Sequence, residues 1–299
     1  MRQSAATRLR ALLSQGPVFA PGACDAFTAR LIDRSGFGEA LYLGGNALGL
    51  SLAKGQPLVT LTETAHHVTQ LCRTTDRPLI VDAGAGFGGI PHIHRTIVEL
   101  EQAGAAAIHI DDQPYPKDPG YHRGEGGLVD VETMADRLRI AVGARRDPDL
   151  LLIARTDVLR EGGTIDDAIT RGRRYCEAGA DALMILDLAP DQLPTVQAAM
   201  PGVPQVWIGG VVPPVPSRQT LAQAGFALSL YPFNTIAAIA QAVEGLWSHA
   251  AETGEIAQAD ALLVTMRRQL AEIAGMETYW NIADDLAGRP RRGGERTAK

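Results

Sequence analysis

Residues 103–113, Ala-Gly-Ala-Ala-Ala-Ile-His-Ile-Asp-Asp-Gln, place a glycine directly before an apolar run that ends in two acids. A glycine after a helix supplies a left-handed cap, and an apolar run of this length is typical of a buried parallel strand. The same order recurs three more times along the chain. The glycines are Gly36, Gly104, Gly179 and Gly225, and the strands that follow them are predicted at 40–43, 106–110, 182–186 and 226–230.

Four further apolar runs complete the set of predicted strands. They lie at 18–20, 79–82, 151–155 and 205–208, and each is followed by room for a helix. Helix starts are marked by Thr60-x-x-Glu63 and Thr164-x-x-Asp167, which are capping-box patterns. Eight strand–helix units in one chain predict an α/β fold, namely a closed (β/α)8 TIM barrel, with an open doubly wound sheet as the alternative.

The predicted barrel occupies most of the chain. No linker or change of composition interrupts the sequence before residue 286, so we expect one domain over 1–286, a barrel with a C-terminal helical extension. Residues 287–299 are rich in glycine and arginine and poor in apolar side chains, which predicts a disordered tail.

Composition excludes several classes of function. A net charge of −6 argues against a nucleic-acid partner, because phosphate binding needs clustered Lys and Arg. No run of eighteen apolar residues is present, so we expect no membrane span, and the first residues lack the apolar stretch of a signal peptide. The three cysteines are widely spaced and match neither a disulfide framework nor a zinc site. Together these features predict a cytoplasmic protein.

The ends of the predicted strands carry the candidate site residues, because reactive groups in such barrels follow the carboxyl ends of the strands. Asp82 ends one strand and Asp111 the next. Neighbouring strands lie about 4.8 Å apart, so the two carboxylates could share one ion. Oxygen ligands alone suit Mg²⁺, with Mn²⁺ as a possible substitute. The alternative is that each acid only caps a helix or lies in a loop.

Four more candidates for substrate binding follow from the same rule. Arg155 closes an otherwise apolar strand, and its guanidinium suits a substrate carboxylate; the alternative is a structural salt bridge to Asp157 or Asp187. Successive backbone N–H groups at Gly44, Gly45 and Asn46 could hold a carboxylate or an enolate oxygen.

A long polar segment, residues 114–128, is predicted to be a mobile lid over the mouth of the barrel. It contains the candidate catalytic residues Lys117, Tyr121 and His122. An imidazole can act as a general acid near neutral pH, so we expect His122 to be the proton donor, with Tyr121 as its rival. The alternative is that His122 is an exposed lid residue without a role.

At these residues the sequence resembles the isocitrate lyase and phosphoenolpyruvate mutase superfamily, over roughly residues 10–250. The resemblance implies Mg²⁺, a 2-oxo or 2-hydroxy carboxylate substrate, an enolate, and the cleavage or formation of C–C or P–C bonds. It places Asp82 as the direct metal ligand, Asp111 in the shell of the metal and Arg155 on the substrate carboxylate. It also implies a homodimer or homotetramer that exchanges a C-terminal helix. The segments that carry it are 21–26, 42–45, 59–63, 82–88, 108–113, 153–157 and 177–182.

The chain departs from the pattern of this superfamily at three positions. Gly84 stands where the metal motif has a second acid, Pro119 where the lyases have a catalytic cysteine, and Leu186 where a glutamate follows the sixth strand. We therefore expect a divergent Mg²⁺-dependent lyase that acts through an enolate on a small 2-hydroxy- or 2-oxo-dicarboxylate. The alternatives are a phosphonopyruvate-type P–C enzyme and a catalytically degenerate barrel that binds a carboxylate.

Overall fold

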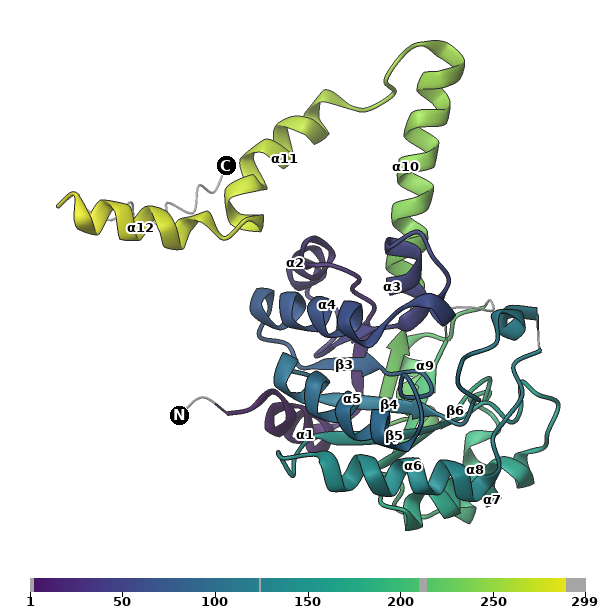
Figure 1. The fold of residues 1–299 in the computed structure, drawn as a ribbon. Coiled ribbons are helices and arrows are strands. Elements are labelled where there is room, and N and C mark those ends of the chain that lie inside the picture. Colours follow the sequence, from purple (N-terminus) through teal and green to yellow (C-terminus); the bar gives the residue numbers. More distant parts are fainter. Residues whose placement is uncertain (1–2, 124, 210–213, 289–299) are drawn as a thin grey trace. The chain divides into compact units, whose positions relative to one another are not determined.

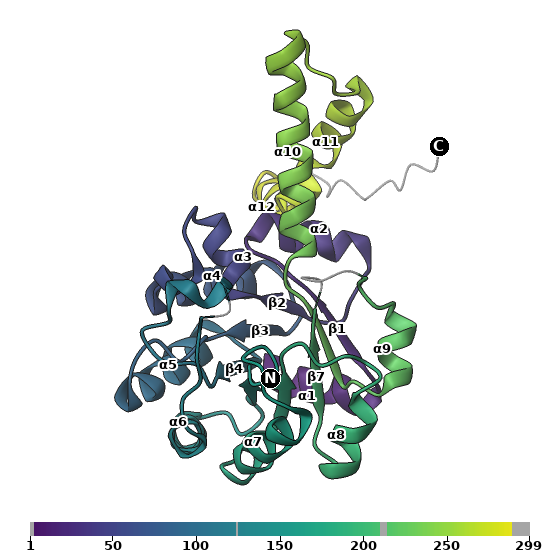
Figure 2. The same cartoon turned by 90° about the vertical axis from the view of Figure 1, so that its right-hand side faces the viewer.

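The computed structural model describes residues 3–123, 125–209 and 214–288. Eight parallel strands form one sheet that closes on itself and is surrounded by helices (Figures 1 and 2). All eight strands lie where the sequence predicts them. They are β1 (Val18–Pro21), β2 (Leu41–Leu43), β3 (Leu79–Asp82), β4 (Ala107–Asp111), β5 (Leu151–Thr156), β6 (Ala182–Ile185), β7 (Gln205–Ile208) and β8 (Leu228–Tyr231).

The order of the strands confirms the barrel and rules out the open sheet. The first strand pairs with the last, with Val18 opposite Leu228, and the remaining strands follow in sequence from β8 back to β2. The join between β1 and β2 is made by an isolated bridge between Gly22 and Tyr42 and by the N–H of Ala23, which donates to the carbonyl of Tyr42 at 2.9 Å.

Helices follow the strands as the predicted units require. The capping boxes at Thr60 and Thr164 are both present, so the two sequence patterns mark true helix starts. The helices of the barrel are α1 (Ala5–Gln15), α2 (Ala26–Ser35), α3 (Gly45–Ser51), α4 (Leu61–Thr74), α5 (Ile90–Ala103), α6 (Val131–Ala144), α7 (Ile165–Glu177), α8 (Leu193–Ala199) and α9 (Arg218–Ala224), with short 3-10 helices η1 (Gln56–Leu58) and η2 (Pro119–Arg123).

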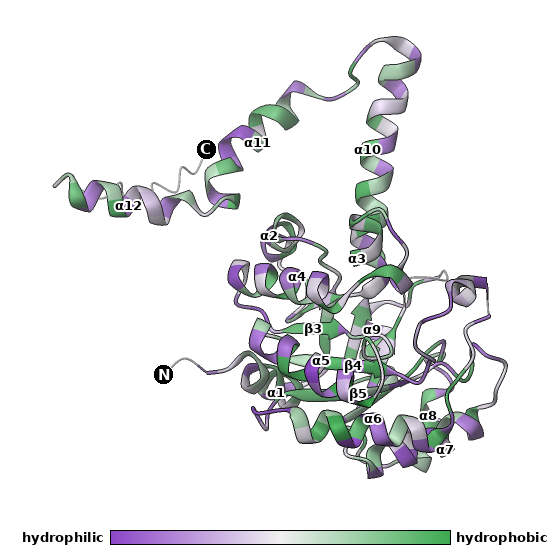
Figure 3. Ribbon diagram, in the orientation of Figure 1, coloured by the Kyte–Doolittle hydropathy of each residue, from purple (hydrophilic) through white to green (hydrophobic). Residues whose placement is uncertain are grey.

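The two-residue period of the strands decides which side chains face the axis of the barrel. One buried cluster contains inward residues such as Ile80, Ala107 and Ile153, whereas a second contains Val81 and Ile108, which pack against the helices. Figure 3 shows the strands as a largely hydrophobic layer inside helices of mixed character. Asp82, His109, Asp111 and Arg155 share the register of the inward set, so the alternation itself turns these polar side chains to the interior.

The chain divides into two compact units, Met1–Ile239 and Ala240–Lys299, where the sequence predicted one domain over 1–286. Helix α10 (Asn234–Thr253) crosses the division, and α11 (Asp260–Ile273) and α12 (Met276–Leu286) lie in the second unit. None of these three helices contains a buried residue. Among the described residues, no helix is both long and apolar enough to cross a bilayer. The predicted tail at 287–299 lies outside the described residues except for 287 and 288.

We expect opposite effects from one substitution made at two glycines. Gly36 caps α2 at φ 71°, and although a Cβ there would meet no atom within 4 Å, that backbone conformation disfavours any side chain. Gly36→Ala should therefore lower the free energy of unfolding by about 1 kcal/mol. Gly143→Ala, on an exposed face of α6 with open space around it, should raise it by up to about 1 kcal/mol. Urea unfolding measures both; a loss of stability at both glycines would contradict this account.

Candidate active site

A cavity of about 380 Å³ opens at the carboxyl ends of the strands. Residues that follow β2, β3, β5, β6, β7 and β8 line it, so it lies at the end of the barrel where the sequence places the site. Of the predicted residues, Gly44, Gly45, Asn46, Asp82, Tyr121 and Arg155 line this cavity.

Asp82 is buried and is fixed by three hydrogen bonds. The N–H of Gly84 donates to Oδ1 at 2.8 Å, while the N–H of Gly45 and the side-chain amide of Gln56 donate to Oδ2 at 3.0 and 3.1 Å. Burial alone would raise the pKa of Asp82, but the electrostatic effects of His109, Lys117 and Arg155 and the hydrogen bond from the Gly84 N–H outweigh it and hold the pKa below its ordinary range. The carboxyl group is therefore an anion at neutral pH.

Asp111 is fully buried and forms an ion pair with Lys117. Lys117 Nζ lies 2.8 Å from Asp111 Oδ2, whereas Asp111 Oδ1 has no hydrogen-bond partner in the described structure. Burial would lower the pKa of Lys117, but Asp111 and Asp82 raise it above its ordinary value, so the amine is an ammonium ion. A buried carboxylate oxygen without a partner calls for a ligand such as a cation or water.

The donor set fits a Mg²⁺ ion. No cluster of three or more His, Cys, Asp or Glu side chains with metal-site spacing occurs among the described residues. Mg²⁺ commonly takes only one or two carboxylates, however, and fills its other positions with water and substrate oxygens. Asp82 and Asp111 supply these two carboxylates, and the unpartnered Asp111 Oδ1 supports the fit. At Gly84, where the superfamily has an acid, an added Cβ would meet only Lys117 Nζ, at 3.9 Å.

Arg155 combines the two roles that the sequence left open. Its Nε and NH2 donate to the two oxygens of Asp157 at 2.6 and 2.9 Å, so the structural salt bridge is present. The ion pair is buried, and Asp157 raises the pKa of Arg155 despite the opposing effect of burial. NH1 takes part in none of these bonds, and Arg155 lines the cavity. The salt bridge thus fixes the guanidinium and leaves NH1 as the nitrogen that can bind an anion.

Tyr121 is the lid residue that reaches furthest into the site. Its hydroxyl accepts hydrogen bonds from Arg155 NH2 at 2.7 Å and from Arg160 NH1 at 3.3 Å. Lys117 Nζ lies 4.8 Å from the centre of its ring. The phenol oxygen therefore lies between two guanidinium groups at the wall of the cavity. The backbone of His122 belongs to η2, and its side chain lies outside the part of the chain that the structure describes.

The backbone at Gly44–Asn46 both supports Asp82 and lines the cavity. The N–H of Gly45, which the sequence assigned to a substrate oxygen, donates instead to Asp82. A Cβ at Gly45 would meet Gln56 Nε2 at 2.4 Å, so only glycine leaves room for the amide that also holds Asp82. Gly44 and Asn46 line the cavity.

Several residues of the site were not predicted from the sequence. Asp112 is fully buried and accepts hydrogen bonds from Thr156, the N–H of Asp157, Arg171 and Tyr175, which ties β4 to β5 and α7. His109, which is fully buried in β4, shares a hydrogen bond of 2.9 Å between Nε2 and the hydroxyl of Tyr42. The signal for Asp112 was its place directly after Asp111, at the end of β4.

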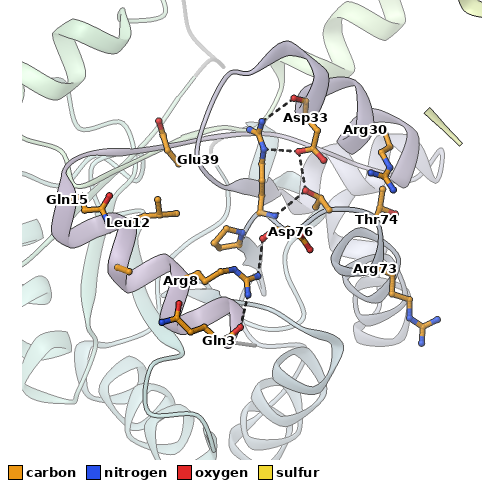
Figure 4. Close-up of a pocket in the computed structure, with 14 residues that line it drawn as sticks. Gln3, Arg8, Leu12, Gln15, Arg30, Asp33, Glu39, Arg73, Thr74 and Asp76 are labelled. Carbon is orange, nitrogen blue, oxygen red and sulfur yellow. Dashed lines mark hydrogen bonds and ion pairs between the residues drawn. The ribbon is translucent and has the colours of Figure 1, made fainter. Parts of the chain in front are cut away.

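A larger cavity, of about 780 Å³, lies at the opposite ends of the strands and is drawn in Figure 4. Four arginines line it, but two of them tie the chain together: Arg77 bonds to Asp33 and to the carbonyls of Phe37 and Gly38, and Arg8 to the carbonyls of Gln3 and Asp76. We place the active site at the smaller cavity, because only there do buried charged groups converge.

Comparison with known proteins places these features in a family. The family model described as phosphoenolpyruvate phosphomutase matches residues 9–250. The chain is 33% identical to 2,3-dimethylmalate lyase of Eubacterium barkeri, over 94% of this chain and 98% of that protein. It is 37% identical to 2-methylisocitrate lyase of Aeropyrum pernix, over 88% and 84%. A crystal structure of phosphonopyruvate hydrolase with oxalate and Mg²⁺ superposes with a TM-score of 0.83 at 28% identity, covering 95% and 99% of the two chains.

None of the three cysteines has the environment of a reactive thiol. Burial raises the pKa of Cys24 and Cys176, and it raises the pKa of Cys72 to about 11. At pH 8 a thiol with this pKa is thiolate about 10²-fold less often than an unperturbed one, so alkylation should be slower by about that factor. We expect iodoacetamide to leave the activity of the native protein unchanged, whereas unfolding in urea should make all three thiols react. If activity were lost in step with the labelling of one cysteine, that cysteine would be required for activity and the prediction would be wrong.

Proposed function

Because the chain belongs to the phosphoenolpyruvate phosphomutase family, within the isocitrate lyase and phosphoenolpyruvate mutase superfamily, we propose that it is a Mg²⁺-dependent lyase. Its substrate would be a small 2-hydroxy- or 2-oxo-dicarboxylate, which it cleaves at a carbon–carbon bond or decarboxylates through an enolate. The observation that carries this proposal is the convergence of Asp82, Asp111 and Arg155 at one end of the barrel, beside a single cavity.

Asp82 and Asp111 would hold the ion. Asp82 is an anion whose orientation three hydrogen bonds fix, which suits a direct ligand. Asp111 has one free oxygen that can bind the ion or one of its waters. When bound, Mg²⁺ would act as a Lewis acid on substrate oxygens. Mn²⁺, which accepts the same oxygen ligands, is a possible substitute.

Arg155 would bind the carboxylate of the substrate through NH1, since Asp157 engages the other side of the guanidinium. Gly44 and Asn46, which also line the cavity, would contact the other end of the substrate. Cleavage of a 2-hydroxy acid transfers the proton of the hydroxyl group to a base such as a water molecule, and breaks the bond between carbons 2 and 3 to leave a carbonyl group at carbon 2. The electron pair then remains on carbon 3, beside the second carboxylate, as an enolate that must accept a proton.

Tyr121 is the proton donor that the geometry favours. Pro119 has no proton to give, whereas the Tyr121 hydroxyl lies at the cavity wall between Arg155 and Arg160. Two guanidinium groups stabilise the phenolate that remains after transfer of the proton, which is what an acid in this position requires. Lys117, as an ammonium ion beside Asp111 and the Tyr121 ring, would hold the lid in place. His122 remains the alternative donor that the sequence suggested.

Asp82→Ala should abolish metal-dependent turnover, because it removes the carboxylate that the surrounding N–H groups position for the ion. The matched control is Asp136→Ala, which removes an exposed acid paired with Arg139 on the surface. Turnover of malate, methylmalates, oxaloacetate and phosphonopyruvate, with and without Mg²⁺, can be followed by NMR. An Asp82→Ala variant that still responds to Mg²⁺ would disprove the assignment of the metal site.

Tyr121→Phe should lower kcat by about 10²- to 10⁴-fold, the usual contribution of a positioned general acid. The Arg155–Asp157 pair does not depend on the phenol, so KM should change far less than kcat. His122→Gln is the comparison, and both variants should be measured from pH 5.5 to pH 9. If Tyr121→Phe keeps wild-type turnover while His122→Gln loses it, the histidine is the donor.

We further propose that the protein is a homodimer or homotetramer and that its C-terminal helices mediate the assembly. The second unit exposes large apolar side chains, among them Trp247, which is 57% exposed, and Leu270, Trp280 and Ile282. Contiguous exposed apolar surface is typical of an interface with another chain. Light scattering at micromolar concentration should therefore give at least twice the mass of 31.8 kDa, and Trp247→Glu should lower it. A stable wild-type monomer would contradict this proposal.

A further inference from the structure

The mouth of the barrel is polar on one side. At the cavity, Asn46 follows β2, Asp82 ends β3 and Arg155 lies in the last two residues of β5, while Asp111 ends the intervening β4. Because β2, β3, β4 and β5 are consecutive in the sheet, their polar ends form one continuous half of the rim. This half contains every group to which the proposed function gives a role in binding the metal and the carboxylate.

The other side of the mouth is apolar. Leu186 directly follows β6, Ile208 ends β7, and Pro232 and Phe233 follow β8. Trp207 packs edge-on against Tyr231, with 5.4 Å between the ring centres, and only 6% of its surface is exposed. Strands β6, β7 and β8 are also consecutive, so the apolar ends form a second continuous half of the rim.

The charged pair at the border between the two halves is already neutralised. Arg160 donates through Nε and NH2 to the two oxygens of Asp187, both at 2.8 Å. Among the described residues that line the cavity, Arg155 and Arg160 are the cations. The apolar half therefore offers no free charge to a polar part of a ligand, and water there has few partners to bind.

From this division we infer that the substrate is a dicarboxylate that bears an alkyl substituent, and that this substituent lies against Leu186, Trp207 and Phe233. The inference rests on the proposed function for the polar half. An unsubstituted four-carbon dicarboxylate would leave this apolar surface in contact with water. Each methylene group that covers it should strengthen binding about fourfold, until the wall is filled.

A series of succinates without a hydroxyl group tests this inference separately from catalysis. These compounds have no hydroxyl proton to lose, so the lyase cannot cleave them, and their dissociation constants can be measured by calorimetry in the presence of Mg²⁺. We expect succinate, methylsuccinate, ethylsuccinate and propylsuccinate to bind in order of increasing affinity, by about fourfold per methylene over at least the first two steps.

Leu186→Asn provides the structural control, because it keeps the size of the side chain and removes its apolar character. We expect the gain per methylene to fall below twofold in this variant, while the matched variant Leu58→Asn, at a leucine that is 66% exposed and does not line the cavity, keeps the full gain. Thermal unfolding confirms that both variants are folded. Equal affinity across the series in the wild-type protein, or no binding by any member, would overturn the inference. An increase in affinity that Leu186→Asn removes would support it even if no 2-hydroxy acid is cleaved, which would refute the proposed function alone.

Discussion

Seven charged side chains are buried together where β3, β4 and β5 end, and their charges offset one another. They are Asp82, Asp111, Asp112, Asp157, Lys117, Arg137 and Arg155. Four carboxylates and three cations leave a net charge of −1, which a protein interior accommodates poorly without a counter-ion. A divalent cation would reverse this charge to +1, which suits an anionic substrate. A bound ion would therefore offset the excess negative charge of the cluster and also give it the positive charge that attracts a carboxylate.

The position of this cluster follows from backbone geometry that the sequence reveals directly. Asp82, Asp111 and Arg155 could be predicted because each ends an apolar run, and parallel strands in a barrel bring their carboxyl ends to one mouth. Hydrophobic runs and glycine caps likewise located all eight strands to within two residues at most ends. Both predictions use local patterns, which a single sequence contains in full.

Other features depend on contacts between distant segments and could not be predicted in this way. Gln56 reaches Asp82 from a 3-10 helix that follows no motif, and Arg160 reaches Tyr121 across two loops. The hydrogen bond from the Gly45 N–H to Asp82 also depends on the orientation of the Asp82 side chain, which residue spacing does not predict. For a related reason the helical pattern of α10 does not reveal whether its apolar face is buried, because packing decides this.

Two of the three departures from the superfamily pattern, at Gly84 and Pro119, are linked through one side chain, that of Lys117. Because residue 84 has no side chain, its nearest neighbour in that direction is Lys117 Nζ, 3.9 Å from where a Cβ would lie. Lys117 in turn bonds to Asp111 and lies over the ring of Tyr121, whose hydroxyl reaches Arg155. An acid at residue 84 would compete with Asp111 for the ammonium ion and draw it away from the ring. The absence of an acid at residue 84 therefore helps to hold Tyr121 at the cavity wall. Tyr121 belongs to the loop in which Pro119 stands where the lyases have a cysteine.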